Sequence, residues 1–286
     1  MALEGRWHRS NEQSSTAYIH FTKSEKCVTI LPPMSERPPE LSIIIPAYNE
    51  EKRLTRTLAR IREYFANRQA GAEQIEILVV DDGSTDGTVH VAHEWMREMP
   101  CLRLVSNDRN RGKGYSVRHG MLEARGRVVL FTDADLSSPI EESEKLVAAI
   151  EAGSDAAIGS RAMDRTLIQV HQSRLREIAG IIFNSFVKLF TGLPFQDTQC
   201  GFKAFVRERS TIIFEQQRVE RFGFDPEILF LAKRHGLRVA EVPVRWAHDE
   251  ATRVSVVRDS VQMFGDLLFI RWNWLLGRYP RQTTGE

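Results

Sequence analysis

Three features are scarce in this sequence: cysteine, long apolar runs and excess charge of one sign. Cys27, Cys101 and Cys200 are the three cysteines among 286 residues, an odd number at wide spacings. They suggest no disulfide framework or zinc cluster and favour a reducing compartment. No stretch holds 18 consecutive apolar residues, and the polar residues 1–13 lack an apolar signal core. We therefore expect no transmembrane helix, no secretory signal and a cytoplasmic protein.

Charge and composition exclude further classes. Lys and Arg number 39 and Asp and Glu 38, a net charge of +1, which argues against a dedicated nucleic-acid-binding protein. Apolar residues make up 42% and charged residues 27% of the chain, which is typical of a globular protein. The length allows one large domain or two small ones.

Residues 1–40 are expected to form an N-terminal extension, partly extended or disordered. Four of the eleven prolines lie there, as Pro32, Pro33, Pro38 and Pro39, and paired prolines forbid helix. The segment shows no residue pattern that indicates chemistry.

From residue 41 onwards, short β-branched runs alternate with amphipathic segments. Leu41–Ile45 has the composition of a buried strand that Pro46 ends, and Asn49 is in place to cap the following helix. Further strands are expected at 75–80, 102–106, 128–132 and 156–159, with helices between them. This alternation predicts an α/β fold with a mainly parallel sheet that is flanked by helices. Its ligand site should lie at the carboxyl ends of the strands, in the loops 46–50, 81–87, 107–114 and 133–138.

The strand and helix pattern of the sequence changes after Ser160. Residues 173–190 and 258–276 are rich in apolar and aromatic side chains and predict two amphipathic helices, with a strand at 238–244 between them. Residues 160–190 carry five Lys or Arg and two Asp or Glu, a local net charge of +3. Basic residues beside an apolar face are typical of a helix at a membrane surface, and the alternative is packing as core or as a dimer interface.

The strongest local signal is a pair of aspartates just after a predicted strand. Asp133 and Asp135 flank Ala134, and a turn here would bring both carboxylates onto one divalent cation. Mg²⁺ and Mn²⁺ accept such oxygen ligands together with those of a diphosphate. The alternative is a solvated turn whose acids cap the next helix.

Two other strand ends carry polar motifs. In Asp81–Ser84, an acid can accept hydrogen bonds from a base or a ribose, and a glycine allows a ligand to approach closely; a capped turn is the alternative. In Asn107–Gly114, glycines flank a lysine ahead of a helix, where backbone N–H groups and a cation could receive phosphate. The spacing matches neither a Walker A motif nor a dinucleotide-binding motif.

These motifs occur in the order IIIPAYNE, VVDDGSTDGT, NRGKG and TDAD, and together they resemble the family-2 glycosyltransferases, whose nucleotide-sugar-binding fold is called GT-A. In the second half, IGSRA, DTQCGFK, VERFGFDPEI and DLLFIR resemble the dolichyl-phosphate glucosyltransferase branch. The resemblance covers roughly residues 41–275. It implies inverting transfer of a sugar from UDP-glucose or GDP-mannose to a polyprenyl phosphate, and the DTQCGFK run favours UDP-glucose.

The resemblance also assigns roles to matching residues. It implies that Asp133 and Asp135 hold Mg²⁺ or Mn²⁺ on the donor diphosphate, and that Asp225 is a third catalytic acid that positions the acceptor. A helix N-cap before Pro226 is the alternative role for Asp225. The implied donor-binding residues are Pro46, Ala47, Tyr48, Glu50, Asp81, Asp82, Gly83, Ser84, Lys113, Gly114, Asp133 and Ala134. The implied contacts to the acceptor phosphate are Arg161, Arg174, Gln199 and Lys203, and a solvated strand residue is the alternative for Lys203.

Two departures from the family pattern qualify this interpretation. Eukaryotic members of the glucosyl branch carry an N-terminal membrane helix, which is not expected here, so membrane contact would come from surface helices. Ser137 stands where mannosyl relatives often carry Gln, which weakens the mannosyl alternative.

We therefore predict a GT-A-like, metal-dependent, inverting hexosyltransferase at the cytoplasmic face of a membrane. Residues 41–160 would form its nucleotide-sugar half and residues 161–286 its acceptor and membrane-interface half. The nearest alternative is a GDP-mannose enzyme or one with another acceptor. A non-catalytic nucleotide-binding protein would not need to keep paired metal ligands, and a nucleotidyltransferase would usually have a Gly- and Arg/Lys-rich loop at 46–50. The oligomeric state stays open.

Overall fold

The computed structural model describes residues 38–67, 75–170, 172–248 and 256–280, without the side chains of 174–176 and 256–260. The expected extension at 1–40 lies almost wholly outside the described residues. All of the described residues belong to a single structural unit.

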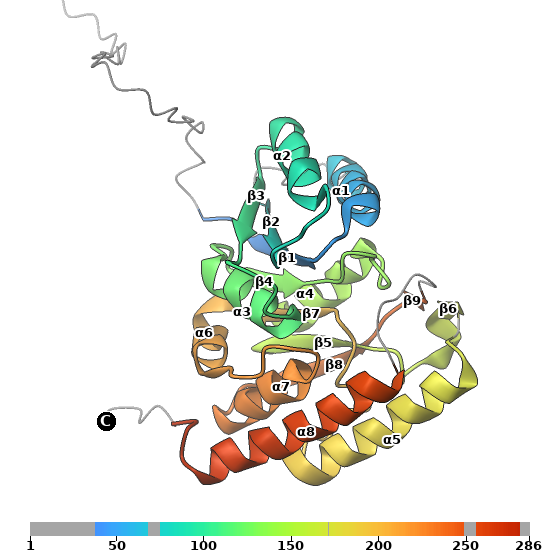
Figure 1. Cartoon of the computed structure of the whole chain (residues 1–286), viewed down its shortest axis with the longest axis vertical. Helices are drawn as coiled ribbons and strands as arrows, with labels where there is room; N and C mark the ends of the chain where they lie inside the picture. Colours follow the sequence, from blue (N-terminus) through green and yellow to red (C-terminus); the bar gives the residue numbers. More distant parts are fainter. Residues whose placement is uncertain (1–37, 68–74, 171, 249–255, 281–286) are drawn as a thin grey trace, which may run out of the picture. The chain divides into compact units, whose positions relative to one another are not determined.

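A seven-stranded sheet forms the centre of this unit (Figure 1). Its strands are β1 (Leu41–Ala47), β2 (Ile75–Asp81), β3 (Leu102–Ser106), β4 (Val128–Phe131), β5 (Ala156–Ser160), β7 (Lys203–Val206) and β8 (Val239–Pro243). They lie in the order β3-β2-β1-β4-β7-β5-β8, and β7 alone runs antiparallel to its neighbours, β4 and β5. Two short strands, β6 (Ile168–Val170) and β9 (Trp246–Ala247), pair separately. The predicted mainly parallel sheet is confirmed.

Helices cover both faces of the sheet. They are α1 (Glu51–Ala66), α2 (Thr88–Glu98), α3 (Lys113–Glu123), α4 (Ser143–Glu151), α5 (Arg174–Thr191), α6 (Arg207–Gln216), α7 (Phe224–Arg234) and α8 (Val256–Leu275). Because successive strand residues point to opposite faces, Ile43 and Ile45 join the core under α1, α2 and α4, whereas Ile44 joins the core under α3, α6 and α7. Helices α5 and α8 lie side by side and pack outside α7 (Figure 1).

Two local predictions at the first strand were wrong. Pro46 does not end β1, because β1 continues to Ala47 and pairs with β2 there; Pro46 lies beyond the part of β1 that pairs with β4, where a missing N–H is tolerated. Asn49 does not cap α1, which begins at Glu51 after Glu50. Instead Asn49 has a φ of 54°, a left-handed conformation that asparagine tolerates better than most residues.

The second half holds elements that the sequence pattern did not reveal. Strand β7 and helix α6 follow the segment 191–202, and α7 begins at Phe224. The two expected apolar helices are present as α5 and α8, and the expected strand at 238–244 is β8. No helix in the described ranges is both long enough and apolar enough to span a bilayer.

The packing of α3 on the sheet requires a residue without a side chain at Gly120. A Cβ atom there would lie 2.4 Å from Cγ2 of Ile44 and 2.9 Å from Cγ2 of Val80. We expect Gly120→Ala to lower the free energy of unfolding by roughly 1–3 kcal/mol, because overpacking outweighs the gain in helix propensity. Urea unfolding followed by circular dichroism measures this loss.

Gly265 in α8 is the matched control, because a Cβ there would meet no atom within 4 Å. Gly265→Ala should raise the free energy of unfolding by about 0.5–1 kcal/mol. Equal effects of the two substitutions would contradict the close approach of α3 to β1.

Candidate functional site

The loops that follow β1 and β2 are bound to each other by hydrogen bonds. The backbone N–H of Asn49 donates to Oγ of Ser84 at 2.9 Å, and Oδ1 of Asn49 accepts from the N–H of Thr85 at 2.8 Å. The N–H of Glu50 donates to Oγ1 of Thr88 at 2.8 Å. This pairing explains the conformation of Asn49 and holds the expected donor-binding loops at one edge of the sheet.

Asp82 organises a third loop. Its carboxylate accepts from Nδ2 of Asn107 at 2.8 Å, from the N–H of Arg111 at 3.0 Å and from the N–H of Gly112 at 2.8 Å. Asp82 is 3% exposed. Its observed contacts are therefore with the loop before α3, a positioning role that the sequence reasoning did not anticipate.

Asp81 and Gly83 complete this arrangement. The Asp81 carboxylate accepts from the N–H groups of Gly83 and Ser84 at 3.2 Å. Gly83 has a φ of 72°, and a Cβ there would lie 2.7 Å from the carbonyl carbon of Arg109. Only glycine fits this left-handed turn without displacing the neighbouring loop.

Asp133 and Asp135 lie on one tight turn after β4. The N–H of Leu136 donates to the Asp133 carbonyl at 3.1 Å, and the N–H of Ser137 donates to Oδ1 of Asp135 at 2.9 Å. Leu136 has a φ of 50°, an unfavourable conformation for a branched side chain. The rest of the fold must therefore hold this turn in its strained conformation, and such strain is common at functional sites.

Lys113 at the start of α3 forms an ion pair with Asp133. Burial by itself would lower the pKa of Lys113, but the carboxylates of Asp133, Asp225 and Asp135 raise it above its ordinary value. Gly201 packs directly against the Asp133 carboxylate, because a Cβ atom at Gly201 would lie 2.3 Å from Oδ2 of Asp133. The loop after β4, the start of α3 and the segment before β7 thus meet at this carboxylate.

The carboxylate oxygens of Asp133 and Asp135 suit a divalent cation. Burial, and then the charge of Asp133, raise the pKa of Asp135 above its ordinary value, and a cation between the two carboxylates would relieve this repulsion. Among the described residues, no group of three or more His, Cys, Asp and Glu side chains is placed to hold a metal ion. A cation at Asp133 and Asp135 would therefore complete its coordination with water and substrate oxygens, as Mg²⁺ commonly does.

Lys203 at the start of β7 and Asp225 of α7 form a buried ion pair near Asp133. Nζ of Lys203 donates to Oδ1 of Asp225 and to the carbonyl of Cys200, each at 2.5 Å. The Lys203 side chain has no exposed surface, so the expectation that it meets the acceptor phosphate is wrong. Asp225 is not the N-cap of α7 either, because Gly223 precedes the helix and Asp225 lies in its first turn. Burial raises the pKa of Asp225, and Lys203 opposes that effect.

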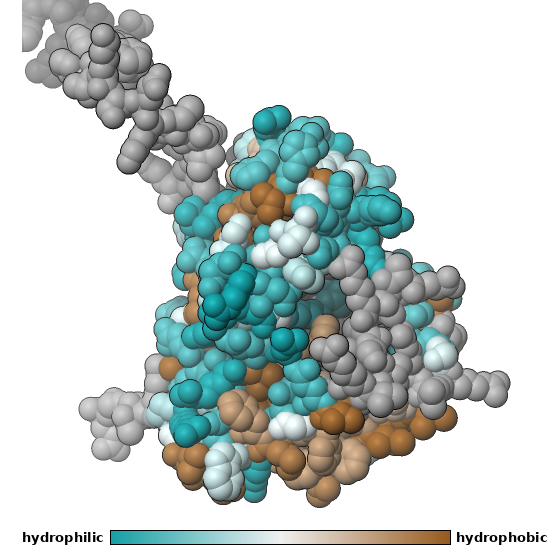
Figure 2. All heavy atoms as spheres, in the orientation of Figure 1, coloured by the Kyte–Doolittle hydropathy of each residue, from teal (hydrophilic) through white to brown (hydrophobic). Residues whose placement is uncertain are grey.

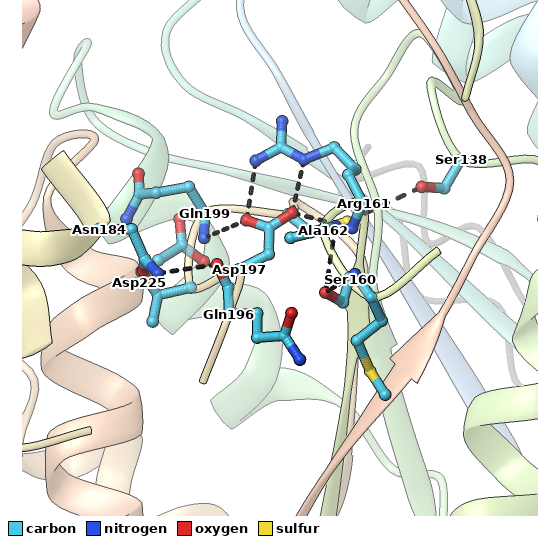
Figure 3. Close-up of polar contacts among 12 residues, drawn as sticks. Ser138, Ser160, Arg161, Ala162, Asn184, Gln196, Asp197, Gln199 and Asp225 are labelled. Carbon is cyan, nitrogen blue, oxygen red and sulfur yellow. Dashed lines mark hydrogen bonds and ion pairs between the residues drawn. The ribbon is translucent and has the colours of Figure 1, made fainter. Parts of the chain in front are cut away.

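Arg161 at the end of β5 is held by Asp197 (Figure 3). Nε donates to Oδ2 at 2.6 Å and Nη2 to Oδ1 at 2.9 Å, which leaves Nη1 pointing away from the carboxylate. Burial by itself would raise the pKa of Asp197, but the Arg161 guanidinium lowers it to about 2. The side chain of Trp246 packs against the same guanidinium, at 5.4 Å from the ring centre.

A cavity of about 440 Å³ opens beside Arg161. Gln199 lines it, and Nε2 of Gln199 is buried with no hydrogen-bond partner among the described residues. Ile181 and Lys188 of α5 form part of its wall. Two of the four residues expected at the acceptor phosphate, Arg161 and Gln199, are thus brought together, while the side chain of Arg174 lies outside the description.

The other expected donor-binding residues surround the same strand ends. Pro46 and Ala47 are the last two residues of β1, and Tyr48 after them is 39% exposed. Glu50 forms an ion pair with Arg53. Gly114 is buried at the start of α3, and Ala134 lies between the paired aspartates. The roles of Asp197 and Gly201 were not anticipated, although both lie in the DTQCGFK motif that carried the resemblance.

Comparison with known proteins agrees with this geometry. Residues 42–209, more than half of the chain, match the family described as glycosyl transferase family 2. The chain is 38% identical over 250 residues to a dolichyl-phosphate beta-glucosyltransferase of Drosophila melanogaster, covering 84% of this chain and 77% of the relative. It is also 36% identical to that of Saccharomyces cerevisiae, covering 84% and 76%, and 34% identical to that of Homo sapiens, covering 86% and 79%.

Solved structures show the same fold. Glucosyl-3-phosphoglycerate synthase from Mycobacterium tuberculosis, in complex with Mn²⁺, UDP and glucosyl-3-phosphoglycerate, superimposes with a TM-score of 0.59 at 20% identity, covering 86% of this chain and 82% of that chain. A complex of the same enzyme with Mg²⁺ and UDP gives a TM-score of 0.58. The mainly parallel sheet with its strand-end loops is therefore of the predicted GT-A-like kind, and the chain is a hexosyltransferase that belongs to glycosyl transferase family 2.

Proposed function

We propose that this protein transfers glucose from UDP-glucose to the phosphate group of dolichyl phosphate or a related polyprenyl phosphate. The observation that carries the proposal is the identity of 34–38%, over more than four fifths of the chain, with enzymes named for this transfer. The relatives form a beta linkage, whereas glucose is alpha-linked in UDP-glucose. Transfer from that donor would therefore proceed with inversion at the sugar carbon.

The residues at the strand ends suit a diphosphate donor. A divalent cation held by Asp133 and Asp135 would supply charge stabilisation to the departing diphosphate. Lys113 brings a second positive charge to the same place, and the carboxylates around it keep it protonated. The backbone of the loop 107–114 is held rigidly by Asp82, which limits reorganisation when the donor binds.

Attack by the acceptor phosphate needs little proton transfer. A phosphate monoester is already anionic near neutral pH, so its oxygen can attack without a general base. The Nη1 group of Arg161 and the unpartnered Nε2 of Gln199 are suitable donors for such an anion in the cavity beside them. Asp225 is already paired with Lys203, which favours a positioning role over that of a base.

We also infer that α5 and α8 form a membrane-contacting surface. Large apolar side chains gather on their outer sides, as Figure 2 shows along the lower part of the molecule. The exposed members are Ile178, Ile181, Ile182, Phe186 and Leu189 on α5 and Val261, Leu268, Phe269, Trp272 and Leu275 on α8. A contiguous apolar surface of this size is typical of a contact site, and the lipid-linked acceptor favours a bilayer as its partner.

The charge of this surface differs from the sequence expectation. Arg161 is paired with Asp197 and Arg165 with Glu177, so two of the five basic residues counted at 160–190 are neutralised. Lys188 remains as an exposed cation of α5 near the cavity. Apolar contact therefore contributes more to the proposed docking than the local net charge. The free thiols of Cys101 and Cys200 suit the cytoplasmic face of the membrane.

The proposed donor and metal sites are tested with UDP-glucose, GDP-mannose and detergent-dispersed dolichyl phosphate. We expect turnover of UDP-glucose, dependence on Mg²⁺ or Mn²⁺, and a beta-linked product by NMR. Asp135→Asn should lower kcat by about 100-fold or more, because the cation loses a charged ligand. It should also abolish the thermal stabilisation that Mn²⁺ with UDP gives the wild type.

Glu98→Gln, which changes an exposed carboxylate of α2 to an amide, is the control and should keep both properties. Preferred turnover of GDP-mannose would contradict the donor assignment. Full activity of Asp135→Asn would contradict the metal site.

The Arg161–Asp197 pair predicts a defined pH dependence. Because the folded pKa of Asp197 is lowered to about 2, the pair stabilises the fold above the ordinary pKa of about 3.9 and loses that contribution as the pH falls towards 2. Asp197→Asn should lower the free energy of unfolding by roughly 1.5–3 kcal/mol at pH 7, since the charged hydrogen bonds to the partly exposed Arg161 are lost.

The difference between this variant and the wild type should shrink in urea titrations between pH 4 and pH 2, where Asp197 becomes protonated. Asp108→Asn, at an exposed aspartate beside Arg109, should show little change at any pH. A constant difference across this range would argue against the pair.

The membrane surface is tested by sedimentation with phosphatidylcholine vesicles that contain an anionic lipid. Leu189 and Trp272 are 75% and 61% exposed, and replacing both by Gln should weaken binding at least ~10-fold, since each inserted side chain contributes its burial energy. Leu122→Gln, on α3 and 38% exposed, is the control and should bind as the wild type does. Unchanged binding of the double variant would exclude this surface.

A further inference from the structure

A second cavity shares no lining residue with the acceptor cavity and lies behind the C-terminal end of the loop 107–114. It measures about 360 Å³ and is formed by α3, the end of α6, the segment 217–220 and the C-terminal part of α8. Three arginines from different parts of the chain line it: Arg118, Arg218 and Arg278. Neither the proposed transfer nor the sequence motifs use these residues.

Each arginine is oriented by a hydrogen bond to the protein. Nε of Arg118 donates to the carbonyl of Phe214 at 2.8 Å, and Nη2 of Arg218 donates to the carbonyl of Arg278 at 3.3 Å. Nη1 of Arg278 donates to Oδ1 of Asn273, a fully buried side chain, at 3.1 Å. These partners are all uncharged, and the remaining guanidinium N–H groups stay available for a ligand.

Positive charge predominates in the cavity. Among the residues that the structure describes, none of the three arginines forms an ion pair. Two glutamates also line the cavity, but Glu220 is paired with Arg111 and Glu215 is exposed at the surface. Converging guanidinium groups without carboxylate partners are suited to a phosphate group, whose oxygens they can contact in pairs.

A buried polar atom in the same cavity calls for a hydrogen-bond donor. Gln217 is 3% exposed, and its Nε2 donates to the carbonyls of Gly114 and Val219 at 2.8 and 3.1 Å. These bonds fix the orientation of the amide, so the unpartnered buried atom is the acceptor Oε1. A phosphate anion alone would not satisfy it, whereas a hydroxyl group next to the phosphate would.

The cavity lies beside the proposed membrane-contacting surface. Phe269 and Asn273 of α8 form its wall, and Phe269 is also part of the exposed apolar face of that helix. A headgroup of a lipid in the contacted leaflet could therefore reach the cavity while the apolar side chains enter the bilayer. Soluble phosphate esters could enter by the same opening.

We propose that this cavity binds a phosphate ester that carries a free hydroxyl group, with Arg118, Arg218 and Arg278 at the phosphate and Gln217 at the hydroxyl. A glycerol-type lipid headgroup and a soluble glycerol phosphate share this chemistry. The lipid source rests on the proposed membrane contact of α5 and α8, whereas the soluble source does not.

The test compares phosphatidylcholine vesicles that contain equal fractions of phosphatidylglycerol or phosphatidylmethanol. Both anionic lipids carry one negative charge, but only the headgroup of phosphatidylglycerol has hydroxyl groups that can donate a hydrogen bond. The wild type should bind the phosphatidylglycerol vesicles about fivefold more tightly than the other vesicles, because one additional hydrogen bond to a buried group contributes about that factor to affinity. Arg218→Gln with Arg278→Gln, both at exposed arginines, should lower this binding about tenfold and abolish the preference.

The matched control removes the same charge elsewhere. Arg56 and Arg97 are exposed on α1 and α2, which cover the face of the sheet opposite to that of α3, α6 and α7. Arg56→Gln with Arg97→Gln should keep both the affinity and the preference. In a second arm, glycerol 3-phosphate is titrated into the wild type and both double variants, with binding followed by calorimetry.

A preference for phosphatidylglycerol that only the Arg218/Arg278 variant loses supports a lipid headgroup as the ligand. Calorimetric binding of glycerol 3-phosphate that only this variant loses supports a soluble ester. A wild type without either response, or a variant that keeps both, overturns the proposal. Turnover of UDP-glucose with detergent-dispersed dolichyl phosphate, measured in parallel, tests the proposed transfer separately, because neither arginine belongs to its site.

Discussion

The arrangement of this site depends on one buried ion pair, between Lys203 on β7 and Asp225 on α7. A fully buried ammonium group is costly unless it is paired and hydrogen-bonded, and here it meets both a carboxylate and the carbonyl of Cys200. These bonds fix the segment before β7, so that Gly201 lies directly against Asp133. Asp225 also contributes to the potential that keeps Lys113 protonated beside Asp133. The pair therefore supports the turn at which a cation is proposed to bind.

Acidic residues in this protein divide into two groups. Asp82 and Asp197 are nearly buried, and their oxygens hold a loop and a guanidinium group. Asp133 and Asp135 lie on a strained turn, where the pKa of Asp135 is raised by burial and by its neighbour. The carboxylates of Asp82 and Asp197 are enclosed by their partners, whereas the Asp133 side chain pairs with Lys113 but remains 34% exposed. The second pair is therefore the one proposed to hold a cation, and the first pair positions the groups around it.

The apolar and basic parts of the proposed membrane surface also separate in space. Exposed apolar side chains gather on α5 and α8, and the nearby Arg161 and Arg165 are paired with Asp197 and Glu177. Arg118, Arg218 and Arg278, for which the described residues give no acidic partner, line the second cavity beside the C-terminal part of α8. Such a division would let α5 and α8 enter the bilayer while a polar pocket meets the headgroup layer beside them.

The sequence by itself determined the parallel strands of the sheet and the position of the paired aspartates after β4. Strands β1, β2, β4 and β5 are buried along nearly their whole length, so each contains a short apolar run with recognisable ends. Asp133 and Asp135 stand out because they follow such a run. Strand β7 was missed, since its antiparallel insertion between β4 and β5 depends on pairing between distant segments. For the same reason only the tertiary structure decided that Lys203 faces Asp225, and that Arg161 is held by Asp197: these partners are 22 and 36 residues apart, and folding alone brings them together.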